Sequence, residues 1–322
     1  MQRIMTQGSE VAAFEKEFST LADERHCIAV EPGSSGLHLS LLALGIGCGD
    51  EVIVPSYASE TAAAAVRLAG ATPVFVDIEP QTFCLDPEAV AAALTPRTSA
   101  VVPVHLFGHP AAMHRLSALA ARHGIALLED ASQAPLAQIE GRRVGTYGVV
   151  SIFNVGEAAV ATTADLRLAV TLKLLRDQGH DAGPALTVAA AQAGRGALEG
   201  LVGATARRRA HARFLNSALT GVLVPYVEPG AHHVYHQYTV RVPGNGRPDR
   251  DAFALALAAR GVPATVTIST PVHRLAPYRS RVHLPQTELV AGQTLSLPVR
   301  SGLTEQELVR IAAVCNTLGG LL

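Results

Sequence analysis

From residue 27 onward, short runs of β-branched residues alternate with longer stretches rich in alanine and leucine. This alternation is typical of α/β proteins, in which strands and helices follow one another along the chain. Most of the runs are apolar at consecutive positions, so we expect a mainly parallel sheet with both faces covered by helices. The predicted strands are residues 27–31, 51–55, 72–78, 99–106 and 125–130. The predicted helices are residues 8–23, 34–45, 59–69, 87–94, 111–123 and 165–178.

The pattern changes after Arg195. We predict a long helix near 197–220, a strand at 234–242, helices at 249–260 and 304–319, and an extended stretch around 264–273. The chain is therefore divided into a large α/β domain, residues 1–205, and a small C-terminal α+β domain, residues 206–322.

Composition narrows the class of protein. With a net charge of −1, the chain lacks the excess of positive charge that is typical of proteins that bind nucleic acid or an acidic membrane. No stretch has the features of a signal peptide or a membrane span, so we expect a cytoplasmic protein. The four cysteines are scattered without a CxxC spacing, which favours free thiols and predicts no metal site.

Polar residues follow several predicted strands, where an open parallel sheet binds its ligands. Gly33 and Ser34 stand in a small-residue turn before a helix, which could cradle an anion. Asp130 ends a buried strand, and a carboxylate there is costly unless it has a cationic or N–H partner. His105 follows another strand.

Several long segments resemble a known family. They include LHLSLLALGIGCGDEVIVPSY (37–57), GATPVFVDIEPQTFCLDPEAV (70–90), HGIALLEDASQA (123–134), GRRVGTYG (141–148) and TPVHRLAPYR (270–279). In this order and over essentially the whole chain, they resemble the DegT/StrS family of sugar aminotransferases, which depend on pyridoxal phosphate (PLP). The resemblance implies a fold-type I aminotransferase-like fold and a dimer whose active sites are built from both subunits.

The resemblance also implies roles for residues that the chain keeps. Gly33 and Ser34 occupy the family's phosphate-binding turn, and Asp130 the position that pairs with the pyridinium nitrogen. Gln133 occupies the site near the ring oxygen. These residues outline a vestigial PLP site.

Other positions depart from the family pattern. Family members carry a segment resembling SF-x-PTK, whose lysine forms the imine with PLP, whereas here SIFNVGEAA (151–159) leads straight into VATTADL. The chain contains two lysines, Lys16 and Lys173, and neither stands at that position. Ser59 replaces the aromatic residue that stacks on the ring, and Asn154 replaces a phosphate-contacting serine. We therefore predict that the PLP lysine is lost, and arginine cannot replace it in an imine. Because the imine lysine, the stacking ring and part of the phosphate site are lost together, we also predict that no cofactor is used.

The predicted function is a PLP-independent enzyme of specialised-metabolite biosynthesis, acting on a small molecule of the sugar or aminocyclitol type. Its predicted acid and base residues are Asp130, His105, Glu157, Tyr57 and Glu60. One alternative is a non-catalytic pseudoenzyme subunit that supports an active homologue. A second is a protein that binds PLP or pyridoxamine phosphate (PMP) non-covalently. We expect a homodimer or a heterodimer with an active homologue, and neither nucleic acid nor membrane as a partner.

Overall fold

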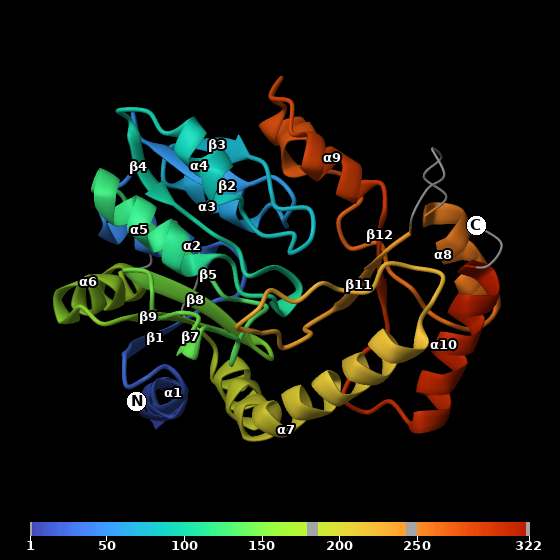
Figure 1. Ribbon diagram of the computed structural model, residues 1–322. Helices are drawn as coiled ribbons and strands as arrows, with labels where there is room; N and C mark the ends of the chain where they lie inside the picture. Colours follow the sequence, from blue (N-terminus) through green and yellow to red (C-terminus); the bar gives the residue numbers. More distant parts are fainter. Residues whose placement is uncertain (1, 179–185, 243–249, 320–322) are drawn as a thin grey trace.

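A seven-stranded sheet lies in the N-terminal part of the chain in the computed structural model, which describes residues 2–178, 186–242 and 250–319 (Figure 1). The strand order is β1-β9-β8-β5-β4-β2-β3. The bounds are β1 His26–Val30, β2 Glu51–Pro55, β3 Thr72–Val76, β4 Thr98–Val101, β5 Ala126–Asp130, β8 Val150–Val155 and β9 Ala158–Thr163.

The sheet is mainly parallel, as the sequence predicts. Strands β3, β2, β4, β5 and β8 pair in parallel, and β9 alone runs antiparallel between β8 and β1. Strands β1 to β5 coincide with the five predicted runs, whereas β8 and β9 are not among the predicted strands. The parallel strands direct their carboxyl ends to one edge of the sheet.

Helices cover both faces of the sheet. They are α1 Gln2–Leu21, α2 Ser35–Ala43, α3 Thr61–Leu68, α4 Pro87–Ala93, α5 Met113–His123, α6 Leu166–Asp177 and α7 Val188–Ala218. Ile28 and Val30 of β1 pack in a core with α2, α3 and α6, whereas Cys27 and Ala29 pack with α1 and α7. This alternation explains why residues 27–30 of the strand are all apolar, because both faces of the strand are buried there.

Asp86 and Pro87 begin the helix predicted at residues 87–94, which forms as α4. The Asp86 carboxylate accepts a hydrogen bond of 2.9 Å from the backbone nitrogen of Glu88, and Pro87 is the first residue of α4. An aspartate cap and a proline that needs no N–H partner both favour a helix start.

A second core lies in the C-terminal part. It joins the end of α7 to α8 Arg250–Ala259, α10 Glu305–Gly319 and a two-stranded sheet of β11 Tyr238–Arg241 and β12 Thr294–Leu297. The predicted boundary after residue 205 falls inside α7, which runs continuously from one core to the other. The division into two domains therefore stays a prediction.

Shorter elements connect these parts. They are η1 Leu106–Gly108, η2 Val272–Arg274, η3 Ala276–Tyr278, α9 Pro285–Ala291 and a three-stranded sheet of β6 Gln138–Ile139, β7 Arg142–Arg143 and β10 Ala231–His232. Val272 and Leu284 pack into the core of the large sheet, so this C-terminal segment returns to the N-terminal part of the chain.

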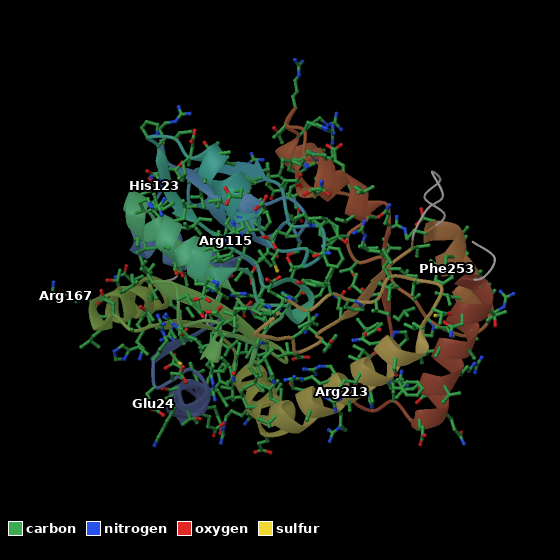
Figure 2. All side chains as sticks on the ribbon, in the orientation of Figure 1. Glu24, Arg115, His123, Arg167, Arg213 and Phe253 are labelled. Carbon is green, nitrogen blue, oxygen red and sulfur yellow. The ribbon has the colours of Figure 1, made fainter. Side chains whose placement is uncertain are left out.

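Side chains separate into core and surface as expected for a globular chain. Glu24, Arg167 and Arg213 are exposed, whereas Phe253 of α8 is buried (Figure 2). Within the described ranges, no helix combines the length and the apolar character that crossing a membrane requires.

Candidate functional site

A cleft of about 320 Å³ lies beyond the carboxyl ends of the parallel strands. Gly33 follows β1, Ser59 follows β2, Asp130 ends β5 and Asn154 belongs to β8. His236, which precedes β11, completes the lining from the C-terminal part. The volume is within the range of pockets that hold small molecules, and the place is where open α/β sheets bind ligands.

Asp130 is a buried carboxylate with few partners. Its side chain accepts a 3.1 Å hydrogen bond from the backbone nitrogen of Ser132, and the residue is 6% exposed. Burial raises the pKa of Asp130 above its usual range, and the hydrogen bonds from Ser132 offset this only in part. Among the described residues it forms no ion pair, so a cationic donor would relieve the cost of burying it.

The turn between β1 and α2 meets the cleft at Gly33, whereas the predicted Ser34 is not part of the lining. Gly33 has a φ of +95°, a conformation that a residue with a side chain rarely adopts, and a Cβ atom there would meet nothing within 4 Å. Ser34 precedes α2, and its side chain does not cap the helix. The first N–H groups of α2 therefore favour a negatively charged group at this turn.

Two amides line the cleft. The side-chain oxygen of Gln133 accepts a 2.7 Å hydrogen bond from the backbone nitrogen of Phe107, which fixes the direction of the amide. The side-chain oxygen of Asn154 is buried and has no hydrogen-bond partner in the described structure. Asn154 thus retains hydrogen-bonding capacity at the wall of the cleft.

Glu129 lies behind the cleft in a dense network. Its oxygens accept hydrogen bonds from the backbone nitrogens of Gly145 (2.7 Å), Tyr147 (2.8 Å) and Gly148 (2.6 Å), and from the Ser151 hydroxyl (3.1 Å). Burial opposes ionisation of this fully buried side chain most strongly, but the hydrogen bonds together lower the pKa of Glu129. The carboxylate thereby holds the 145–148 turn against the end of the sheet.

His105 belongs to the same network and does not line the cleft. Its Nδ1 accepts a 3.0 Å hydrogen bond from the Ala111 backbone nitrogen, so Nε2 carries the hydrogen that it donates to Glu129 at 3.2 Å. The side chain is fully buried. Both ring nitrogens are occupied, which leaves none for proton transfer to a ligand.

Three other predicted catalytic residues also lie outside the described lining of the cleft. Tyr57 is 1% exposed, its hydroxyl contacts Thr294 Oγ1 at 2.5 Å, and burial raises its pKa to about 12. Glu60 is exposed before α3, and Glu157 is exposed in the turn after β8. The catalytic predictions for Tyr57, Glu60, Glu157 and His105 therefore gain no support from their positions.

Neither lysine lines the cleft. Lys16 is exposed on α1. Lys173 lies on α6, where its Nζ is 3.8 Å from Glu15 Oε2 and its side chain is about half exposed. Both lysine side chains are in contact with solvent.

The segment that follows β8 forms a tight hairpin. Val155 pairs with Ala158, so only Gly156 and Glu157 connect β8 to β9. Gly156 has a φ of +59° and Glu157 is not in the left-handed region, which matches a type II′ turn with glycine first. This short connection lies at the wall of the cleft, because Gly156 is part of the lining.

Sequence reasoning missed His236. Its position in the lining depends on a contact between distant segments, which no local pattern reveals. The available signal was the concentration of histidines at His232, His233 and His236. His233 is buried and stacks on Tyr235 with ring centroids 4.1 Å apart, whereas His236 lines the cleft.

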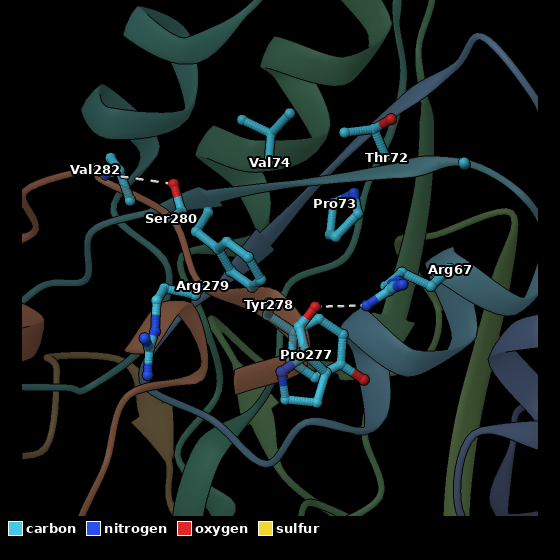
Figure 3. A pocket seen from close by; sticks show the side chains of 11 residues that line it. Arg67, Thr72, Pro73, Val74, Pro277, Tyr278, Arg279, Ser280 and Val282 are labelled. Atoms are coloured by element: carbon cyan, nitrogen blue, oxygen red, sulfur yellow. Dashed lines mark hydrogen bonds between the residues drawn. The ribbon is translucent and has the colours of Figure 1, made fainter. Parts of the chain in front are cut away.

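An open groove of about 540 Å³ lies elsewhere, beside the edge strand β3 (Figure 3). Arg67 donates a 2.5 Å hydrogen bond to the Pro277 carbonyl oxygen, and its guanidinium lies 5.6 Å from the centre of the Tyr278 ring. The groove shares no lining residue with the Asp130 cleft. Of its two arginines, Arg67 is already engaged by the protein, and the lining contains no buried carboxylate like Asp130, so we place the candidate site at the Asp130 cleft.

The family model described as the DegT/DnrJ/EryC1/StrS aminotransferase family matches residues 1–316. The chain belongs to this family. It is 35% identical to UDP-N-acetyl-3-dehydro-alpha-D-glucosamine 3-aminotransferase of Acidithiobacillus ferrooxidans, over 97% of this chain and 90% of that protein. It is 36% identical to dTDP-3-amino-3,4,6-trideoxy-alpha-D-glucose transaminase of Streptomyces venezuelae, over 94% of this chain and 86% of that protein.

Solved structures of the family have the same fold. An aminotransferase of this family from Brucella abortus superposes with a TM-score of 0.89 at 29% identity, covering 97% of this chain and 90% of that one. NtdA from Bacillus subtilis, solved with bound cofactor PMP, has a TM-score of 0.85 at 26% identity, covering 97% of this chain and 77% of that one. The fold-type I aminotransferase-like fold predicted from the sequence is thus confirmed.

These findings correct one prediction. The expectation that no cofactor is used is wrong for a member of this family, because its relatives are aminotransferases and NtdA was solved with PMP. The error came from treating the combined loss of the imine lysine, the stacking ring and part of the phosphate site as the absence of all binding, although hydrogen bonds and charge pairing also hold a cofactor.

The residues of the cleft fit a pyridoxamine-type cofactor. A protonated ring nitrogen is the cationic donor that the buried, unpaired Asp130 lacks. A phosphate suits the Gly33–Ser34 turn at the start of α2, and Asn154 has a side-chain oxygen without a partner.

Proposed function

We propose that this chain binds PMP or PLP non-covalently in the Asp130 cleft and acts in amino-group transfer to a keto sugar or a related cyclic ketone. The observation that carries the proposal is Asp130. It is a buried carboxylate with a raised pKa and no ion pair among the described residues, and it faces a cleft large enough for a small ligand. The proposal assigns its partner as the ring nitrogen of the cofactor.

The absence of a covalent bond follows from the positions of the lysines. Lys16 and Lys173 lie on α1 and α6, away from the cleft lining, and arginine cannot take their place in an imine. The alignment with the Acidithiobacillus relative is 336 positions long, which is longer than this chain of 322 residues, of which it covers 97%. The alignment must therefore contain gaps in this chain. That relative therefore has residues that this chain lacks, which supports a shortened connection such as the Gly156–Glu157 turn.

Different residues of the cleft would hold different parts of the cofactor. Asp130 would hold the ring nitrogen and keep it protonated, and the start of α2 after Gly33 and Ser34 would hold the phosphate. Gln133, fixed by Phe107, would face the ring. When bound as PMP, the cofactor supplies the amino group and an electron-withdrawing ring.

The substrate class comes from the relatives. The two enzymes named above act on amino sugars attached to UDP and dTDP, according to their names. We propose a ketone of this class as the acceptor. In the balanced exchange, the carbonyl oxygen of the substrate is replaced by hydrogen and an amino group, while the aminomethyl group of PMP becomes the aldehyde of PLP.

Without a covalent bond, the cofactor would exchange with solvent as a second substrate. A chain that holds its cofactor by an ion pair and hydrogen bonds releases it at a rate set by those contacts. Each product molecule formed would then consume one PMP from solution. The expected homodimer, or heterodimer with an active homologue, stays a prediction.

The test is binding of PMP and PLP to the dialysed protein by isothermal titration calorimetry, followed by borohydride reduction and intact-mass measurement. We expect one saturable site per chain, no mass added by reduction, and more than one PMP consumed per chain when a keto-sugar nucleotide is supplied. A lysine adduct after reduction contradicts the non-covalent site. Failure of both PMP and PLP to bind contradicts the proposal and favours the pseudoenzyme subunit.

A further inference from the structure

His236 is the second titratable side chain of the cleft. Among the described residues that line it, Asp130 and His236 are the two with an acidic or basic side chain; the other side chains are hydroxyl, amide or apolar. Asp130 is assigned to the ring nitrogen of the cofactor, and neither lysine is within the lining. His236 is therefore the one acid–base side chain of the described lining that has no assigned role.

The ring of His236 is free to act. Within the described ranges, it forms no hydrogen bond or ion pair, and solvent reaches it through the cleft. The surrounding protein, and secondly the charge of Arg208, lower the pKa of His236 below its ordinary value. The imidazole is therefore neutral near pH 7 and can accept a proton.

The backbone around His236 is held in an unusual conformation. Tyr235 has a φ of 49° and Phe107, on the facing segment, a φ of 57°, both in the left-handed region that bulky residues rarely adopt. The Val234 backbone nitrogen donates to the Gly108 oxygen at 3.0 Å, and that of Gln237 donates to the Phe107 oxygen at 3.2 Å. These bonds flank His236 on both sides and fix its position over the cleft.

Gly108 permits this close approach. A Cβ atom at position 108 would lie 2.8 Å from Val234 Cγ2 and 2.9 Å from the His236 backbone nitrogen. Phe107 in turn is bonded to Gln133, which lines the same cleft. The strained contact thus connects His236 to the side of the cleft that carries Asp130, a pattern found where structure is held for function.

We propose that His236 is the proton-transfer residue of this cleft. An imidazole nitrogen accepts a proton from a carbon of the bound ligand, so that the C–H bond breaks, its electron pair stays on the ligand and an N–H bond forms. The same nitrogen then returns the proton to a second ligand carbon, where a C–H bond forms from that electron pair. Proton and electrons balance without an oxidant or reductant. This inference rests on the proposed function, because it needs a ligand held at Asp130.

The first readout is independent of turnover. Protein with carbon-13-labelled histidine is titrated with PMP, and the imidazole signal of His236 is identified by its loss in His236→Asn. We expect that signal to move as PMP binds. His232→Asn is the matched control, because His232 also has a pKa lowered first by burial but does not line the cleft.

The second readout is exchange of the methylene hydrogens of PMP for deuterium in heavy water, followed by mass spectrometry. His236→Asn is expected to slow the exchange by about 100-fold or more, the usual contribution of a general base, while calorimetry shows that PMP still binds. His232→Asn should leave the exchange rate unchanged.

The outcomes separate this inference from the proposed function. If PMP binds but the His236 signal does not move, or if exchange continues at the original rate in His236→Asn, the role of His236 is wrong and the proposed function stands. If the unsubstituted protein binds no PMP, both are overturned.

Discussion

Two adjacent carboxylates at the end of β5 have opposite surroundings. Glu129 points to the back of the sheet, where three backbone N–H groups, a hydroxyl and His105 surround it, and its pKa is lowered. Asp130 points to the cleft, where Ser132 is its one hydrogen-bond donor among the residues that the structure describes, and its pKa is raised. Both side chains are buried.

The difference between Glu129 and Asp130 shows that burial alone does not tell whether a carboxylate at this edge of the sheet has a structural or a ligand-binding role. A buried carboxylate whose donors are all supplied by the protein is part of the structure, and its removal costs stability. A buried carboxylate that faces a cleft with few hydrogen-bond donors lowers the stability of the fold, and a bound ligand can supply the missing donor or positive charge. The predictions below test this contrast between Glu129 and Asp130.

The largest effect is expected at Glu129. Glu129→Ala leaves five buried donors without an acceptor and should destabilise the fold by about 3–5 kcal/mol, as loss of one partner in a buried charged network does. Denaturant unfolding followed by circular dichroism measures this, with Glu60→Ala at an exposed position as the control. A loss below about 1 kcal/mol would contradict the structural role.

Asp130 should behave in the opposite way. Asp130→Asn removes the charge that is assigned to the ring nitrogen, so PMP affinity should fall by about 10- to 100-fold, the value of one hydrogen bond to a charged group. Calorimetry measures the affinity, and Asp251→Asn, at an exposed carboxylate, serves as the control. Unchanged affinity would place the ring nitrogen elsewhere.

Gly108→Ala tests the contact that positions His236. The substitution places a Cβ too close to Val234 and His236 at a φ of +93°, and should destabilise the protein by about 1–2 kcal/mol. It should also slow deuterium exchange into PMP, because His236 is displaced. Gly124→Ala is the matched control: this glycine also has a positive φ, but a Cβ there would meet nothing within 4 Å. Equal exchange rates in the two variants would count against a positioning role for the contact.

The smallest expected effect is on the pH dependence of stability without cofactor. Because the folded-state pKa of Asp130 is raised, its contribution to stability is present below the unfolded pKa and is lost as pH rises through the folded pKa. Asp130→Asn should therefore gain thermal stability relative to the unsubstituted protein as pH rises from acid to neutral. Differential scanning calorimetry across this range measures the difference in Tm, which should shrink when PMP is added. A difference that does not vary with pH would mean that Asp130 has a partner in the folded chain.

Much of the fold could be predicted from local patterns. Strands β1 to β5 and helices α2 to α6 are continuous in sequence, and their apolar composition reflects burial on both faces. Strands β8 and β9 were missed because β8 contains Ser151 and Asn154 among its apolar residues, and β9 is an alanine- and threonine-rich run. Strand β9 pairs with β8 in a hairpin and with β1, which lies far away in the chain. Pairing with β1 stabilises it, and no local propensity encodes that contact.

The candidate site was predicted in part. Gly33, Asp130 and Gln133 were identified at strand ends and do line the cleft. His105 and Tyr57 also follow strands, yet their side chains are bonded inside the protein. A position after a strand places a residue near the correct edge of the sheet, but the direction of its side chain depends on the loop conformation.

The α/β class and the family could be recognised from the amino-acid sequence alone, because they depend on residue identity and on order along the chain. The sequence also shows directly the carboxylate at the end of β5 and the presence of only two lysines. The tertiary structure decided that Glu129 is satisfied while Asp130 faces the cleft, that both lysines lie away from it, and that His236 enters it from the C-terminal part. The reason is physical: burial, hydrogen-bond partners and electrostatic environment are properties of neighbours in space, and residues 130 and 236 become neighbours of one cleft only when the chain has folded.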